Sequence, residues 1–132
     1  RFLKEAERLT MSIPGCVIVS GDTPKKERER ILEMFKVGEI PVVANVGVLT
    51  TGFDYPELDT VVMARPTMSL AMYYQIVGRC IRPHKDKEAA WFVDLCGNIN
   101  RFGEVSDLHL KDTGNGKWAV FSRGRQLTNV RF

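Results

Sequence analysis

The sequence CVIVSGDTPKKERERILEMFKVGEIPVVANV, residues 16–46, decides the fold. Two short apolar runs, at 16–19 and 41–46, flank a charged segment, and such runs are typical of strands covered on both faces of a sheet. Thr23 is a suitable N-cap for a helix in the charged segment, and Gly38 is a suitable C-cap. The stretch therefore predicts a strand, a helix and a second strand parallel to the first.

The same alternation continues along the chain. Apolar runs at 60–64 and 89–95 predict two further strands, with a helix between them over about 69–81. That helix is expected to end before Pro83, which biases Arg82 away from the helical conformation. We therefore predict an α/β fold, an open parallel sheet with helices on both faces.

The N-terminal residues predict one more helix, over 1–11, which Pro14 and Gly15 would end. Neither an initiator Met nor a capping residue precedes this helix, so we expect the chain to be part of a longer protein. The loops that follow the predicted strands are polar and contain glycine. Parallel sheets of this kind bind their ligands at the carboxyl ends of the strands, so these loops are where we expect a functional site.

The net charge of +3 is concentrated near the C-terminus, where the alternation stops. Here 117–121 and 126–132 predict an antiparallel ribbon, so we expect a lobe over 1–105 and a basic β-hairpin extension over 106–132. Aromatic residues interleave with cations in this extension, a composition suited to nucleic acid. The other interpretation is a hairpin whose basic face is merely solvated. The cations are Lys117, Arg123, Arg125 and Arg131.

Composition excludes several classes of protein. No apolar run approaches the roughly 18–20 residues that a membrane span needs, and no signal-like pattern opens the chain. We therefore expect a cytoplasmic protein without membrane contact. The three cysteines form no C-x-x-C pair and the two histidines are isolated, so no metal site is predicted.

The segment QIVGRCIR, residues 75–82, carries the most chemistry. On a helix, Gln75, Arg79 and Arg82 share one face with the small residue Gly78, which leaves room for an anion beside two guanidinium groups. Arginine suits phosphate because its planar fork donates hydrogen bonds in pairs and stays charged. A surface face of ion pairs is the alternative. The core stripe predicted for this helix is Leu70, Tyr74, Val77 and Ile81.

A second candidate segment is the loop VLTTGFDYP, residues 48–56. Gly52 permits a tight backbone, Thr50 and Thr51 offer hydroxyl groups, and Asp54 could accept hydrogen bonds from a ribose or an arginine. The alternative is a surface turn in which Asp54 bonds to nearby amides.

These two segments, in this order and at this spacing, resemble motifs V and VI of superfamily-two helicases. The surrounding sequence is most similar to bacterial DEAD/DEAH-related helicases of the RadD-like kind, over about residues 1–103. The resemblance implies the second RecA-like lobe of a motor. It implies that Arg82 is an arginine finger reaching the γ-phosphate of ATP, with Arg79 a second phosphate contact and Gln75 near the attacking water.

The resemblance also implies contacts through motif V. Gly52 and Asp54 would link the nucleotide to the nucleic-acid strand. Many relatives carry a threonine six positions before the motif V glycine, where this chain has Val46, and Thr50 or Thr51 could supply that hydroxyl instead. The nucleic-acid contacts implied in this way are Ser20, Gly21, Thr50, Thr51 and Thr67.

The sequence contains no G-x-x-x-x-G-K-[ST] phosphate loop and no acidic magnesium motif. We therefore expect ATP and Mg²⁺ to be held by an N-terminal RecA-like lobe of the same polypeptide, and this chain alone to be inactive. We further expect the protein to be a monomer that acts on nucleic acid. DNA is favoured over RNA as that nucleic acid, and DNA repair is the expected process. Two alternatives stay open: an α/β module that binds nucleic acid without nucleotide chemistry, and a translocase that does not unwind duplex.

Overall fold

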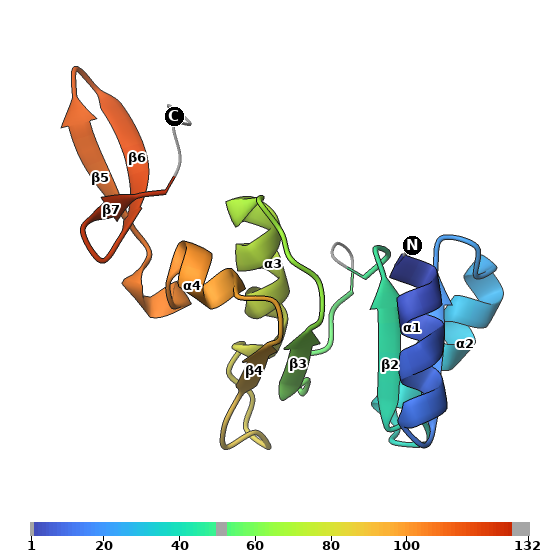
Figure 1. Ribbon diagram of the computed structural model, residues 1–132. Coiled ribbons are helices and arrows are strands. Elements are labelled where there is room, and N and C mark those ends of the chain that lie inside the picture. The colour runs from blue at the N-terminus through green and yellow to red at the C-terminus, as the bar shows by residue number, and fades with distance from the viewer. Residues whose placement is uncertain (1, 50–52, 128–132) are drawn as a thin grey trace. The chain divides into compact units, whose positions relative to one another are not determined.

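The computed structural model describes residues 2–49 and 53–127. The chain divides into two compact units, residues 1–55 and 56–132 (Figure 1). Each unit contains one pair of parallel strands with helices packed on it, and the second unit also carries an antiparallel sheet. The α/β prediction, with a C-terminal antiparallel sheet, is confirmed.

The first unit is the strand–helix–strand element with a helix before it. Its strands pair in parallel, from Cys16 opposite Val42 to Ser20 opposite Val46. Val19 and Ile31 are buried where the second helix packs on one face, and the first helix contacts both strands. The elements are α1 (Phe2–Ser12), β1 (Cys16–Ser20), α2 (Lys25–Lys36) and β2 (Val42–Val46).

The N-cap predicted for α2 is wrong. Pro24 occupies the cap position, and no side chain caps the helix. The hydroxyl of Thr23 instead accepts a hydrogen bond from the backbone N–H of Ser20 at 3.0 Å, because it closes the turn that follows β1. At the other end Val37 is the C-cap, and Gly38 follows it with the left-handed φ of +82° that glycine adopts readily.

The second unit begins with a parallel pair, from Thr60 opposite Trp91 to Met63 opposite Asp94. The helix between these strands packs on both of them, as predicted for a crossover element. A short helix that the sequence did not predict follows the second strand. The elements are β3 (Thr60–Met63), α3 (Leu70–Cys80), β4 (Trp91–Asp94), α4 (Asn98–Phe102) and a 3₁₀ turn (Val105–Asp107).

The core stripe predicted for α3 is right for Val77, which is buried, and for Leu70, which packs against the core, but wrong for Tyr74 and Ile81. Tyr73, Val77 and Cys80 are its buried residues, whereas Tyr74 is 56% exposed and Ile81 is 49% exposed. Both sets have helical spacing, so periodicity alone does not choose between them. Tyr73 is the buried tyrosine because its ring packs against the rings of Phe92 and Phe102, at centroid distances of 5.9 and 5.2 Å.

The C-terminal sheet has strand order β5 (His109–Gly114), β6 (Lys117–Ser122), β7 (Arg125–Gln126). The predicted pairing across the turn at 122–125 is confirmed by Phe121 opposite Gln126 and Ser122 opposite Arg125. Residues 128–132 of the predicted ribbon lie outside the described residues. Strand β5, which the sequence did not predict, is exposed at every position and pairs with β6 through the longer of the two hairpins.

Candidate functional site

The three residues predicted to act on phosphate differ in how far they lie from the buried side of α3. Tyr73, Val77 and Cys80 face the interior, and residues two positions away on a helix point about 200° around its axis. Gln75 is accordingly exposed, whereas Arg79, one position before the buried Cys80, is half-buried and its Nε is covered. Helix α3 ends at Cys80 with Ile81 as its C-cap, so Arg82 is exposed just beyond the helix.

A buried polar network fixes the start of α3. Asn98 has no exposed surface, and its side-chain carbonyl accepts a hydrogen bond from the N–H of Thr67 at 2.9 Å. The amide of Asn98 donates to the carbonyl of Arg65 at 3.1 Å. Arg101 donates to the carbonyl of Thr67 at 2.9 Å. The loop between β3 and α3 is therefore held from α4.

The hydroxyl of Thr67, a predicted nucleic-acid contact, is used inside the protein. Thr67 is buried and its Oγ1 accepts the N–H of Ser69 at 3.0 Å. Ser69 is in turn the N-cap of α3, and its hydroxyl accepts the N–H of Met72 at 3.2 Å. These two hydroxyl groups place the first turn of the helix that carries the arginines.

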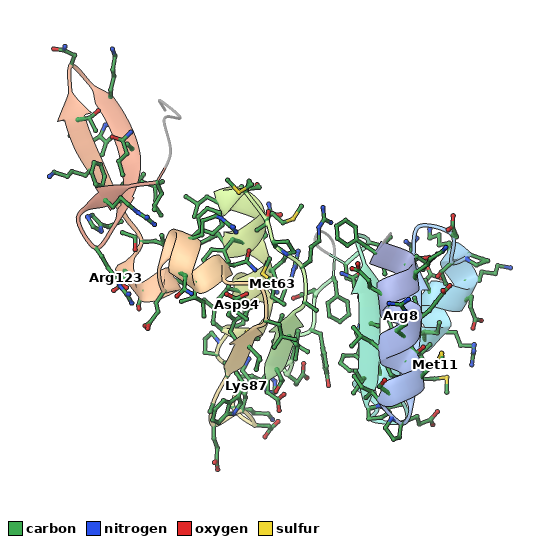
Figure 2. All side chains as sticks on the ribbon, in the orientation of Figure 1. Arg8, Met11, Met63, Lys87, Asp94 and Arg123 are labelled. Carbon is green, nitrogen blue, oxygen red and sulfur yellow. The ribbon has the colours of Figure 1, made fainter. Side chains whose placement is uncertain are left out.

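Asp94 organises the same network from the end of β4, beside Met63 at the end of β3 (Figure 2). Burial alone would raise the pKa of the Asp94 carboxyl. Hydrogen bonds from the N–H of Ile99, the amide of Asn98 and the N–H of Cys96 outweigh this effect and hold that pKa below its usual value. The sequence predicts a polar loop after the strand at 89–95, but it does not show that Asp94 and Asn98 bond to each other.

Two of the predicted nucleic-acid residues, Ser20 and Gly21, lie at the end of β1 and in the turn that follows it. Ser20 is buried and its hydroxyl accepts the N–H of Asp22 at 3.3 Å, while Gly21 is exposed. Asp54 is also exposed and belongs to the first unit. The other predicted residues of that loop, Thr50, Thr51 and Gly52, lie outside the described residues.

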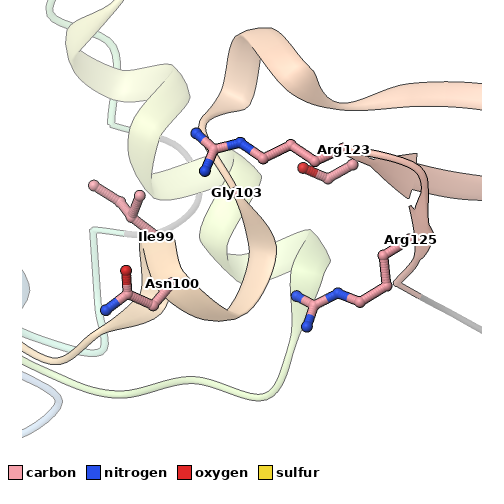
Figure 3. A pocket seen from close by; sticks show the side chains of 6 residues that line it. Ile99, Asn100, Gly103, Arg123 and Arg125 are labelled. Atoms are coloured by element: carbon pink, nitrogen blue, oxygen red, sulfur yellow. The ribbon is translucent and has the colours of Figure 1, made fainter.

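A pocket of about 240 Å³ opens between α4 and the turn that joins β6 to β7 (Figure 3). The arginines that line it are engaged within the chain. The Nε of Arg123 donates to Asp107 at 2.7 Å, which raises the pKa of that guanidinium. Arg125 donates to the carbonyl of Arg101. The lining residues are Ile99, Asn100, Gly103, Ser122, Arg123 and Arg125.

Residues 2–49 and 53–127 contain neither a cluster of metal-ligating side chains nor a helix suited to a membrane span. No group of three or more histidine, cysteine, aspartate or glutamate side chains is placed to hold a metal ion. None of the helices in those ranges combines the length and the apolar character that crossing a bilayer would require.

Known proteins resemble the chain in sequence and in structure. A Saccharomyces cerevisiae protein named "Putative ATP-dependent helicase IRC3" is 38% identical over 79 residues, which are 60% of this chain and 12% of that protein. A 51.5 kDa protein of a Lactococcus phage is 34% identical over 105 residues, 78% of this chain and 23% of the phage protein. The solved C-terminal domain of the DEAD-box protein Dbp5 aligns with a TM-score of 0.52 and 26% identity, over 71% of this chain and 56% of that one.

The chain thus spans about an eighth of the first relative and about a quarter of the second. A family model described as "Helicase conserved C-terminal domain" matches residues 2–84, more than half of the chain. The matched region runs from α1 to the residues just after α3, so it includes Arg79 and Arg82. By this match, the chain belongs to the family of helicase conserved C-terminal domains.

Proposed function

We propose that this chain is the second motor lobe of an ATP-dependent nucleic-acid helicase or translocase, and that Arg79 and Arg82 act on ATP held by a first lobe of the same polypeptide. In this proposal the first lobe also holds Mg²⁺. The proposal extends to a role for Gln75 in placing the attacking water. In this proposal DNA is the nucleic acid along which the motor moves.

One observation carries the proposal. Arg82 is exposed just beyond the end of α3, and Gln75 is exposed on the helix, while Arg79 between them is half-buried with its Nε covered. A packed helix with fixed first and last turns can present guanidinium groups at a defined position, and a planar guanidinium suits phosphate oxygens.

The chemistry available to these residues is electrostatic. A guanidinium that approaches the transferred phosphoryl group neutralises negative charge that builds in the transition state, which in phosphoryl transfer contributes on the order of 10³–10⁵ in rate. Since the arginines and the nucleotide belong to different lobes in this proposal, hydrolysis would depend on closure of the lobes. Such closure is what would couple hydrolysis to movement along a strand.

The test compares Arg82→Ala, Arg82→Lys and Arg8→Ala in the full-length protein. Arg8 is an exposed residue of α1 and serves as the matched control. We expect Arg82→Ala to lower nucleic-acid-stimulated ATP turnover by about 10³ or more. Arg82→Lys should recover little of it, because an ammonium lacks the planar fork. Arg8→Ala should match the wild type.

The same preparations separate the alternatives. A full-length protein that binds nucleic acid but hydrolyses no ATP would identify the chain as a binding module without nucleotide chemistry. A protein that hydrolyses ATP along single strands but releases no strand from a duplex would be a translocase. Both outcomes are read from a turnover assay and a strand-displacement assay run in parallel.

A further inference from the structure

The side-chain ammonium of Lys87 is shared among three backbone carbonyl groups. Its Nζ donates to Pro56 at 2.8 Å, to Leu58 at 3.0 Å and to Cys80 at 2.9 Å. These three bonds use all three hydrogen-bond donors of the ammonium. Lys87 is half-buried, and the group is therefore held in one place by acceptors that the protein supplies.

The carbonyl of Cys80 gives this contact its position on α3. Cys80 is the last residue of the helix, where the final carbonyl groups have no partner within the helix and the helix dipole is negative. A cation is therefore favourable at this end. Arg82 follows only two residues later, so Lys87 fixes the backbone from which the arginine side chain leaves.

The other two carbonyl groups tie this helix end to the chain that leads into β3. Pro56 and Leu58 precede β3, which begins at Thr60. A second contact joins the same two segments, since the Nε2 of His84 lies 3.7 Å from Glu57 Oε1. The loop after α3 is thus held to the segment that leads into β3.

The loop itself has little freedom. Pro83 has a fixed φ, and the N–H of Lys87 donates to the carbonyl of His84 at 3.1 Å, which closes a turn. The N–H of Asp86 donates to the Nδ1 of His84 at 3.3 Å. Arg82 therefore lies between a packed helix on one side and a closed turn, anchored by Lys87, on the other.

We propose that Lys87 is a positioning residue for Arg82: by binding Cys80, Pro56 and Leu58 it sets where the guanidinium can reach. This inference rests on the proposed function, because it presumes that Arg82 acts on a phosphate. Lys87 does not touch the nucleotide in this account. A displacement of about 1 Å at a catalytic group can cost on the order of 10²-fold in rate, so losing the three bonds should be costly.

The test is a double-mutant cycle in the full-length protein with Lys87→Met, Arg82→Ala and both together. Lys87→Met keeps the length and the apolar stem but removes the ammonium. We expect it to lower kcat for ATP about 10- to 100-fold and to leave KM for ATP unchanged. Adding it to Arg82→Ala should cause no further loss, because residues that act as a unit are non-additive.

Three variants control for damage to the fold. Lys85→Met alters an exposed lysine of the same loop and should leave kcat at the wild-type value. Lys87→Arg, which keeps cationic donors at this position, should recover part of kcat. Lys87→Gln repeats the cycle with a polar side chain, in case Lys87→Met does not fold, and the same non-additivity is expected.

The possible outcomes separate this inference from the proposed function. If Arg82→Ala is inactive while the Lys87 variants fold and keep wild-type kcat, the positioning role is overturned and the proposed function stands. Losses that multiply in the double variant also overturn it, since Lys87 would then act independently of Arg82. If Arg82→Ala itself retains wild-type turnover, the proposed function fails.

Discussion

The phenol of Tyr73 donates a hydrogen bond to the carbonyl of Gly103 at 2.8 Å, and both groups are buried. The bond joins a residue near the start of α3 to the residue that caps the C-terminal end of α4. Burial in this position, with a smaller effect from the negative charge of Asp94, raises the pKa of the phenol, which therefore stays a donor. This contact holds Tyr73 on the buried side of α3.

Tyr73→Phe should lower the free energy of unfolding of the 132-residue chain by about 1–2 kcal/mol. The ring remains packed between Phe92 and Phe102, so the loss comes from the unsatisfied carbonyl of Gly103. Urea unfolding followed by circular dichroism measures it. Tyr74→Phe is the control because Tyr74 is exposed, and it should change stability by less than about 0.5 kcal/mol. Equal effects of the two variants would contradict the role of the hydrogen bond.

Asn98→Ala should destabilise the chain by about 2–4 kcal/mol. It removes the acceptor of the Thr67 N–H and the donor to the Arg65 carbonyl, both in a fully buried site. Asn100→Ala, an exposed position on the same short helix, is the control and should cost little. Thermal unfolding of the two variants tests this prediction. If Asn98→Ala had the same melting temperature as Asn100→Ala, the prediction would be wrong.

The folded-state pKa of Asp94 lies below its usual value of 3.8, so its ionised form stabilises the fold. That contribution is fully present above pH 3.8 and declines as pH falls from 3.8 toward the folded-state pKa. Asp94→Asn should therefore be less stable than the wild type at pH 7, and the gap should narrow below pH 4. The measurement is the urea midpoint of both proteins between pH 7 and pH 3. A difference in urea midpoint that stays constant over this pH range would contradict the stabilising role of the Asp94 carboxylate.

Two glycines should respond oppositely to alanine. Gly103 has φ of +85°, and a Cβ there would lie 2.1 Å from Ser122 Oγ, so Gly103→Ala should destabilise the chain by more than about 1 kcal/mol. Gly78 is helical and a Cβ there meets no atom within 4 Å, so Gly78→Ala should stabilise it by about 0.5–1 kcal/mol. Thermal unfolding measures both effects: the melting temperature should fall for Gly103→Ala and rise for Gly78→Ala.

Gly78→Ala also bears on function. The sequence predicts that Gly78 leaves room for an anion beside Arg79 and Arg82, so the more stable variant should hydrolyse ATP more slowly in the full-length protein. A stabilised variant with unchanged turnover would show that the phosphate does not approach this face of α3.

The elements that the sequence predicted are those in which local patterns and tertiary packing agree. The strand–helix–strand element of residues 16–46 carries continuous apolar runs around a charged helix, and the structure forms β1, α2 and β2 there. The helix that carries Arg79 ends at Cys80, next to the predicted limit, since Pro83 restricts the residue before it. These features depend on neighbours in the sequence, so the sequence alone is enough to find them.

The elements that were missed depend on distant partners. Strand β5 reads HLKDTG, which has no apolar alternation, and it forms because β6 offers it a partner. The rotation of α3 is decided by Phe92 and Phe102, which lie 19 and 29 residues from Tyr73 in the sequence. Likewise, the three carbonyl groups that Lys87 binds come from two separate segments, and no motif predicts that set.

The candidate site also has residues that the sequence could single out and residues that it could not. Residue type and spacing single out Arg79 and Arg82 as candidates, because phosphate suits paired guanidinium groups, and their action on a phosphate stays a prediction. The buried supports, Asp94 and Asn98, could not, because an aspartate and an asparagine after a strand are also what an ordinary turn contains. Only their hydrogen bonds to each other and to the loop before α3 reveal that role.

The most direct test of the account is single-turnover cleavage of ATP already bound to the full-length protein, with wild type and Arg82→Ala compared at saturating nucleic acid. The account predicts that Arg82→Ala binds ATP as the wild type does but cleaves it about 10³-fold or more slowly. Equal rate constants for cleavage in the two proteins would show that Arg82 does not act on the phosphate, and the central claim would be wrong.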